Sequence, residues 1–297
     1  MSERIFRFAP SPNGHLHLGH ALSALLNRQA ADRFGGRLLL RLEDIDQTRC
    51  TPDLEREMLE DLSWLGITFD GPVWRQSERF AAYGTALDRL QSIGLVYRGY
   101  LTRAEIKAHV ARLESETGRA WPRDPDGAPH YPGDASVLPP DEINSRWTNA
   151  APFALRLDMK AALDQISGPL VWMEASAEGA DLANTRPAPI AADPSIWGDV
   201  VLARKDTPTS YHLSVVVDDA AQQITDVVRG RDLYAATSVH RLLQDLLGYP
   251  APVYCHHRLI LGPDGTKLSK SAGDTSLRAL RAAGMNLSGL MRRIGLA

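Results

Sequence analysis

The stretch IFRFAPSPNGHLHLGH at residues 5–20 contains a predicted strand, a loop and the start of a helix. Ile5 to Phe8 is a short apolar run, which predicts a buried strand. A proline- and glycine-containing loop follows, and the spacing of apolar residues predicts a helix from about Leu18 until Gly35 ends it. This order predicts the first unit of a Rossmann-like fold, in which phosphates bind between strand and helix.

The tetrapeptide HLGH at residues 17–20 places two imidazoles and a glycine at the start of this helix. The first turn of a helix has backbone N–H groups without intrahelical partners, and it therefore attracts anions. Gly19 lets a ligand approach the backbone closely, while His17 and His20 can donate hydrogen bonds to phosphate oxygens. A lone histidine at a helix start is more often only a cap. The tetrapeptide by itself is therefore a weak signal.

A second motif, KLSKS at residues 267–271, lies near the other end of the chain. The sequence GPDG just before it predicts a turn, so Lys267 and Lys270 are expected on a loop that can close over a ligand. Together the two motifs resemble the signatures of class I aminoacyl-tRNA synthetases. The resemblance implies that ATP is a substrate and that the catalytic residues are His17, His20 and Lys270. It also implies an ATP site formed by His17, Gly19, His20, Lys267, Ser269 and Lys270.

The pattern of the whole chain predicts two halves of one sheet, separated by a less regular stretch. Leu38 to Leu42 predicts a strand that places Glu43 at its carboxyl end, where open parallel sheets bind ligands. Regular periodicity weakens from about residue 98 and resumes at about 196, with strands predicted at 200–203, 214–217 and 225–228 and a helix at 238–247. We therefore expect an α/β fold: a Rossmann-like parallel-sheet nucleotide-binding domain split by an α+β insertion, with a short helical C-terminal segment.

Four further motifs resemble the catalytic domain of glutamyl-tRNA synthetases. They are RFAPSP at 7–12, RLEDID at 41–46, Tyr211 followed by VVVDD at 215–219, and VRG at 228–230. The resemblance implies that Arg7, Tyr211 and Arg229 face the substrate carboxylates, to which a planar guanidinium is well suited, and that Glu43 faces the amino group. The complete glutamate site implied is Arg7, Phe8, Ala9, Pro10, Ser11, Glu43, Tyr211 and Arg229.

The chain ends soon after the lysine motif, so no anticodon-binding domain is expected. It resembles the glutamyl-queuosine tRNA(Asp) synthetases, and Val215 stands where ordinary glutamyl-tRNA synthetases usually have asparagine. The resemblance implies activation of L-glutamate by ATP and its transfer to queuosine in the anticodon loop of tRNA(Asp). Two alternatives remain open: a stand-alone ligase that charges a tRNA 3′ end or another carrier, and an inactive tRNA-binding paralogue.

The resemblance also suggests a division of the chain. Residues 1–97 and 195–255 would form the halves of the catalytic domain, 98–194 an inserted tRNA-contacting subdomain, and 256–297 the lysine-motif loop and the helical end.

The resembled family often has a zinc site in this insertion. Here the corresponding positions are Gly99, Leu101, Tyr131 and Ala135, and no cysteine lies nearby. Because thiolates are the usual ligands of structural zinc, we expect no metal bound by the protein, only Mg²⁺ accompanying ATP. The insertion would then depend on packing, for which Tyr97, Tyr100, Trp121, Tyr131 and Trp147 are available.

Composition agrees with these expectations. The formal net charge of −3 is not that of a protein covered in nucleic acid, so tRNA contact would use local basic patches. Candidates near the C-terminus are Arg278, Arg281, Arg292 and Arg293, which a solvated helix face would explain equally well. The two cysteines do not suggest a disulfide framework. No apolar run is long enough to span a membrane, and the N-terminus lacks a signal-peptide pattern. We expect a cytoplasmic monomer that does not contact membranes.

Overall fold

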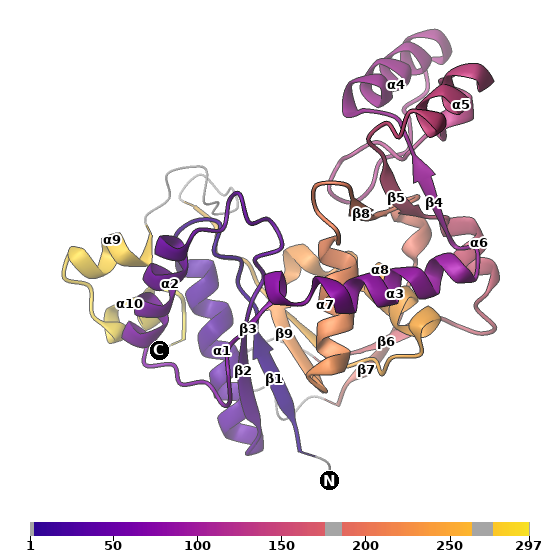
Figure 1. Ribbon diagram of the computed structural model, residues 1–297. Helices are drawn as coiled ribbons and strands as arrows, with labels where there is room; N and C mark the ends of the chain where they lie inside the picture. The colour runs from indigo at the N-terminus through magenta and orange to yellow at the C-terminus, as the bar shows by residue number, and fades with distance from the viewer. Residues whose placement is uncertain (1–2, 176–185, 263–275, 297) are drawn as a thin grey trace.

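The computed structural model describes residues 3–175, 186–262 and 276–296 (Figure 1). Within them, seven strands form one sheet in the order β3 (Trp74–Arg75), β2 (Arg37–Leu42), β1 (Ile5–Phe8), β9 (Asp226–Gly230), β10 (Val253–His257), β6 (Val171–Glu174) and β7 (Ala188–Ala191). Neighbouring strands are parallel except the last pair, β6 and β7. The expected Rossmann-like parallel sheet is confirmed.

Side-chain alternation gives the central strands two different faces. On one face, Phe6, Leu38 and Val228 join a core packed against α1 (Leu18–Phe34). On the other face, the arginines of β1, β2 and β9 follow Ile5, Leu39 and Val227 at two-residue spacing. The three arginines, Arg7, Arg41 and Arg229, therefore lie on the face opposite α1 and are all buried.

Further helices cover the two sides of the sheet. Near α1 lie α2 (Pro52–Trp64), α9 (Leu277–Ala282) and α10 (Leu287–Arg293), which share its core. The other core contains α3 (Phe80–Ser92), α7 (Tyr211–Ala221) and α8 (Ala236–Leu247), together with the short α6 (Met159–Asp164). No helix in the described ranges is long and apolar enough to cross a membrane.

The segment 214–217, predicted as a strand, is instead part of helix α7. Ser210 caps this helix by accepting a hydrogen bond from the Leu213 backbone N–H, and residues 213–219 are all buried. A short apolar run surrounded by protein has no polar face to reveal its period. A buried strand and a buried helix therefore look alike in sequence.

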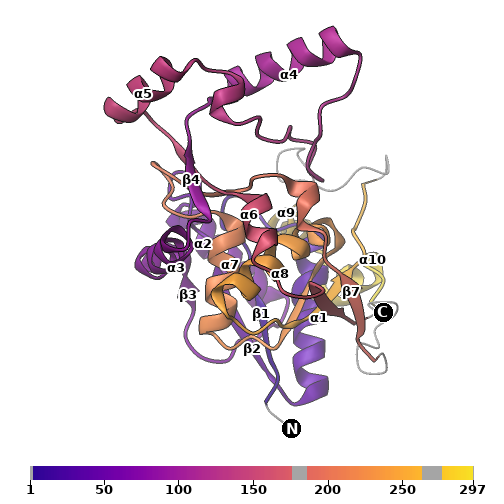
Figure 2. The same cartoon turned by 90° about the vertical axis from the view of Figure 1, so that its right-hand side faces the viewer.

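Beyond the main sheet lies a smaller antiparallel sheet of β4 (Val96–Gly99), β5 (Ala154–Leu157) and β8 (Val201–Arg204). Both views show α4 (Arg103–Thr117) and α5 (Pro140–Thr148) projecting beyond it (Figures 1 and 2). A capping box formed by Thr102 and Glu105 opens α4. Of the aromatic residues expected to hold this region, Trp147 is instead 58% exposed, with the Arg98 guanidinium 4.4 Å from its ring centre.

The strands of the two sheets alternate along the chain. β6 and β7 fall in the range 98–194 but pair with the main sheet, whereas β8 falls in 195–255 and pairs with the small sheet. The division at residues 97, 194 and 255 remains a prediction.

Candidate active site

The HLGH motif forms the first turn of α1, as predicted. His17 is the N-cap residue: its Nδ1 accepts a hydrogen bond from the Gly19 backbone N–H at 3.1 Å. His20 Nδ1 accepts from the His17 backbone N–H at 3.2 Å. Since Nδ1 is the acceptor in both rings, each neutral imidazole carries its proton on Nε2. A Cβ at Gly19 would lie 3.0 Å from the His17 ring, so glycine lets this imidazole fold over the helix start.

The lysine motif, with Lys267, Ser269 and Lys270, lies outside the described residues. Its proposed contact with ATP is therefore an expectation from sequence alone.

A buried ionic cluster lies on the sheet face opposite α1. Asp219 of α7 is 2.8 Å from Arg41 Nη1 and 3.3 Å from Arg7 Nε through the same oxygen, Oδ1. Arg41 also contacts Glu43 at 3.5 Å and donates to Gln222 at 2.8 Å. Each of the two arginines thus has an acidic partner at contact distance, which offsets the cost of burying its charge.

The pKa values of the two carboxylates of this cluster shift in opposite directions. Burial raises the pKa of Glu43, although Arg41 and Arg7 oppose this effect. Burial would also raise the pKa of Asp219, but the charges of Arg7 and Arg41 outweigh it and lower the pKa. Asp219 is therefore the fixed counterion of the cluster. An added cation, such as the ammonium group of an amino acid, would stabilise the ionised form of Glu43.

Arg229 differs from the other two arginines because its hydrogen-bond acceptors are all neutral. Its Nε donates to His256 at 3.1 Å, and Nη1 lies 3.3 Å from the Tyr211 hydroxyl and 3.2 Å from His240 Nδ1. Its Nη2 donates to the Leu233 carbonyl at 3.1 Å and the Thr237 hydroxyl at 2.7 Å. Arg229 is 4% exposed. A buried cation held by neutral groups favours an anionic ligand beside it.

The predicted glutamate residues converge around Tyr211. Burial raises the pKa of Tyr211 to about 12, and the charges that act on it further are those of Arg229, Glu43, Arg7 and Asp219. The Tyr211 hydroxyl contacts Arg229, while Asp219 and Arg41 connect Arg7 to Glu43. The four residues predicted from sequence are therefore brought together although they are far apart in the chain.

Residues 8–11, which were also predicted to bind glutamate, lie in different surroundings. The Phe8 side chain belongs to the core on the α1 face rather than to the ionic cluster. The Pro10 carbonyl accepts a hydrogen bond from the Glu43 backbone N–H at 3.0 Å, which ties this loop to the end of β2. The Ser11 hydroxyl lies 3.7 Å from Cys50 Sγ. Ala9 is half-buried.

The sequence analysis did not assign four further residues to the site. They are Arg41 and Asp219 of the ionic cluster, and His240 and His256, which contact Arg229. A signal for the first two was present, since RLEDID and VVVDD place charged residues beside apolar runs predicted to be buried. The two histidines had no such signal, because nothing local relates them to Arg229.

The four zinc positions of the resembled family do not fit a metal here. Tyr131 donates a hydrogen bond to Asp134 and accepts one from the Leu101 backbone N–H at 3.2 Å. A Cβ at Gly99 would lie 2.8 Å from the Tyr131 hydroxyl, so this space is filled. Throughout residues 3–175, 186–262 and 276–296, no group of three His, Cys, Asp or Glu side chains is arranged to hold a metal.

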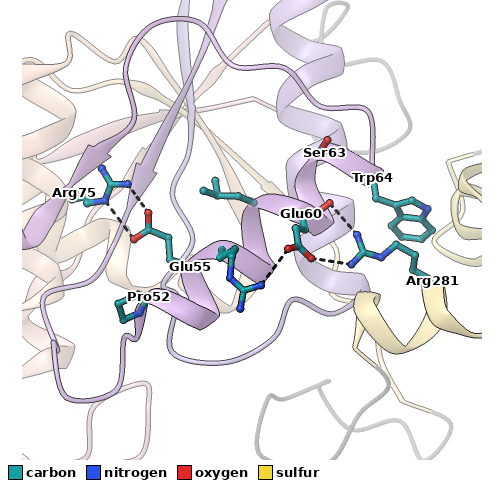
Figure 3. Close-up of a pocket in the computed structure, with 9 residues that line it drawn as sticks. Pro52, Glu55, Glu60, Ser63, Trp64, Arg75 and Arg281 are labelled. Carbon is teal, nitrogen blue, oxygen red and sulfur yellow. Dashed lines mark hydrogen bonds and ion pairs between the residues drawn. The ribbon is translucent and has the colours of Figure 1, made fainter.

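A surface groove of about 810 Å³ lies along the outer side of α2, apart from the buried ionic cluster (Figure 3). Arg281 contacts Glu60 at 3.5 Å within it, and Arg278 pairs with Glu57 nearby. These two C-terminal arginines are thus paired with carboxylates of α2 at the protein surface. A solvated helix face explains them without nucleic acid.

Comparison with known proteins agrees with this geometry. Residues 5–296 match the family model of tRNA synthetases class I (E and Q), catalytic domain. The chain is 45% identical over 293 residues to the glutamyl-Q tRNA(Asp) synthetase of Rhodobacter capsulatus, with 98% of this chain and 100% of the relative covered. It is 39% identical over 282 residues to glutamate–tRNA ligase 2 of Methylorubrum populi, covering 94% of this chain and 57% of that protein.

The fold is similar to that of a solved glutamate-tRNA synthetase from Elizabethkingia anophelis. The TM-score is 0.71 at 28% identity, and the match covers 92% of this chain and 54% of that chain. This chain thus spans about half the length of that synthetase. The chain belongs to the class I tRNA synthetase family (E and Q), in the group of the glutamyl-Q tRNA(Asp) synthetases.

Proposed function

We propose that this protein is a ligase that activates L-glutamate with ATP and transfers it to the queuosine base in the anticodon loop of tRNA(Asp). The observation that carries the glutamate assignment is the buried Arg229, whose acceptors are neutral, beside Tyr211 and the Arg7–Asp219–Glu43 cluster. The 45% identity to a glutamyl-Q tRNA(Asp) synthetase over its whole length supports the queuosine acceptor.

In this proposal the site receives both ends of glutamate. Arg229, together with the Tyr211 hydroxyl, faces a carboxylate, and Arg7 adds a second cation. Glu43 faces the ammonium group, whose charge favours the ionised form of this buried acid. The side chains thus match the charges of the ligand and hold its α-carboxylate for reaction.

The reaction has two steps. An oxygen of the glutamate α-carboxylate attacks the α-phosphorus of ATP, and pyrophosphate leaves. A hydroxyl of the queuosine cyclopentene ring then attacks the activated carbonyl carbon, AMP leaves and the hydroxyl proton is lost. The Nε2–H groups of His17 and His20 would donate to phosphate oxygens, and Lys267 and Lys270 would stabilise the negative charge that develops there.

Mg²⁺ would enter with ATP, held by phosphate oxygens and water, as is usual for this ion in nucleotide enzymes. It would reduce the charge repulsion between the phosphates and the attacking carboxylate. We further propose that the protein acts as a cytoplasmic monomer.

Measurement of ATP–pyrophosphate exchange with glutamate and Mg²⁺, without tRNA, tests the activation step. We expect exchange with glutamate and strong rejection of glutamine, because glutamine leaves buried cationic donors without a carboxylate. Comparable exchange with glutamine would refute the site assignment. Exchange only after tRNA is added would instead favour an ordinary glutamyl-tRNA synthetase.

Charging of tRNA(Asp) with and without queuosine tests the second step. We expect labelled glutamate to be attached only to the queuosine-containing tRNA. Equal labelling of both, in a bond sensitive to removal of the tRNA 3′ end, would support the stand-alone ligase. Absence of both exchange and labelling would support an inactive paralogue.

A further inference from the structure

A chain of hydrogen bonds connects Arg229 to a carboxylate on another strand. Arg229 and His256 are cross-strand partners on β9 and β10, and Arg229 Nε donates to His256 Nε2 at 3.1 Å. On its other side, His256 Nδ1 lies 2.9 Å and 3.0 Å from the two oxygens of Glu174 at the end of β6. One imidazole thus separates the Glu174 carboxylate from the Arg229 guanidinium.

The chemistry of Arg229 determines where the protons lie along this chain. Arginine can only donate, so His256 Nε2 must be the acceptor, and the neutral ring carries its proton on Nδ1. Burial lowers the pKa of His256, which agrees with a neutral ring. Burial would raise the pKa of Glu174, but hydrogen bonds from His256 and Trp172 lower it, so this carboxylate is ionised. The resulting order is carboxylate, neutral imidazole and guanidinium.

Glu174 is itself held in place. Its Oε1 accepts the His256 backbone N–H at 2.9 Å, and its Oε2 accepts the Trp172 indole N–H at 2.9 Å. The Tyr234 ring packs edge-on against both Trp172 and His256, with ring centres 5.4 Å and 5.0 Å away. The carboxylate has therefore little freedom to turn away from the imidazole.

A second histidine holds the opposite side of the guanidinium. His240 Nδ1 accepts from Arg229 Nη1 at 3.2 Å, so its proton lies on Nε2, which is 3.2 Å from His212 Nδ1. Burial lowers the pKa of His212 to about 4 and that of His240 well below its usual range. Both rings are thus neutral. His240 therefore helps to fix the plane of the guanidinium, and His212 holds His240 in place, without either ring supplying a negative charge.

We propose that Glu174, acting through His256, is a positioning residue that sets the orientation and effective charge of Arg229 and thereby the selectivity of the site for a carboxylate-bearing amino acid. This rests on the proposed role of Arg229 in binding glutamate. The negative charge of Glu174 polarises the imidazole, which strengthens its acceptance from Arg229 Nε. The nearest acceptors of Arg229 remain neutral, so its own charge is left for the ligand.

Two adjacent histidines of the protein provide a matched pair of variants to test this positioning role. His256 and His257 are adjacent on β10 and similarly buried, at 7% and 4% exposure. They point to opposite faces of the sheet, since side chains alternate along a strand. His257 Nδ1 lies 2.8 Å from the Arg258 carbonyl and makes no hydrogen bond to Arg229. His256→Phe removes an acceptor of Arg229, whereas His257→Phe makes the same change away from it.

The experiment measures ATP–pyrophosphate exchange as a function of glutamate concentration in the wild type, Glu174→Gln, His256→Phe and His257→Phe. Glu174→Gln keeps an acceptor oxygen but removes the charge, and we expect KM for glutamate to rise roughly three- to tenfold. His256→Phe leaves a buried donor unpaired, so its KM should rise by roughly tenfold or more. In both, kcat should change by less than about twofold and the preference for glutamate over glutamine should fall. His257→Phe should match the wild type.

The outcomes separate this inference from the proposed function. Wild-type exchange with glutamate, combined with an unchanged KM in Glu174→Gln and His256→Phe, would overturn the positioning role and leave the function standing. A decrease in kcat without a rise in KM would also overturn it, as would an equal rise in KM in His257→Phe. No glutamate-dependent exchange in the wild type would overturn both. If His256→Phe does not fold, as judged by circular dichroism, Glu174→Gln decides.

Discussion

Replacing Asp219 by asparagine should strongly destabilise the protein. Both arginine contacts of Asp219 are made by Oδ1, at 2.8 Å from Arg41 and 3.3 Å from Arg7, so asparagine can keep the same acceptor oxygen while losing the charge. Both arginines would then remain buried with less negative charge around them. Breaking a buried ion pair in this way costs about 3–5 kcal/mol of unfolding free energy, or about 5–8 °C in Tm for a chain of this size.

Urea and thermal denaturation, followed by circular dichroism, would measure this loss. Asp245→Asn is a suitable control, because Asp245 pairs with Arg241 at 2.9 Å but is 41% exposed, and such pairs contribute less than about 1 kcal/mol. The pKa of Asp219 is lowered from 3.8, so the stability it contributes is present above pH 3.8 and is lost as pH falls below that value. The loss in Asp219→Asn should therefore be constant between about pH 5 and 8. A loss below about 1 kcal/mol would refute the ionic account of this cluster.

Three other predictions follow from the sequence and the structure. Lys270→Ala should slow ATP–pyrophosphate exchange by about 10²–10³-fold, and an unchanged rate would remove Lys270 from the catalytic residues. Asp61 is 1% exposed and burial raises its pKa from 3.8 to about 6, so it contributes stability below pH 3.8 that is lost as pH rises through about 6. Asp61→Asn should accordingly stabilise the protein by up to about 3 kcal/mol at pH 7.5 and much less near pH 4, as measured by denaturation at both pH values. The purified protein should contain no stoichiometric zinc and keep its activity after chelation once Mg²⁺ is restored; metal analysis that finds about one zinc per chain would contradict this.

Local patterns predicted the elements that have local causes. The strand at 5–8 and the helix from Leu18 to Phe34 were predictable because apolar spacing and the Gly35 C-cap act within a few residues. The same holds for the Thr102–Glu105 capping box. The two-residue spacing of apolar residues around Arg7, Arg41 and Arg229 also predisposes these side chains to one face of a strand. The motifs at 7–12, 17–20 and 41–46 indicated the family, which the comparisons confirm.

The tertiary structure alone decided which groups surround these arginines. Arg7 meets Asp219 across 212 positions of sequence, because β1 lies beside β9 and α7 covers that face. Arg229 meets His256 because β9 and β10 pair in one particular register. The segment 214–217 lies inside a helix that Ser210 caps, and the sequence could not show this because burial on all sides removes the polar face by which a helical period is recognised. Partners so distant in the chain are chosen by strand order and register, and these depend on the packing of the whole sheet rather than on any local spacing.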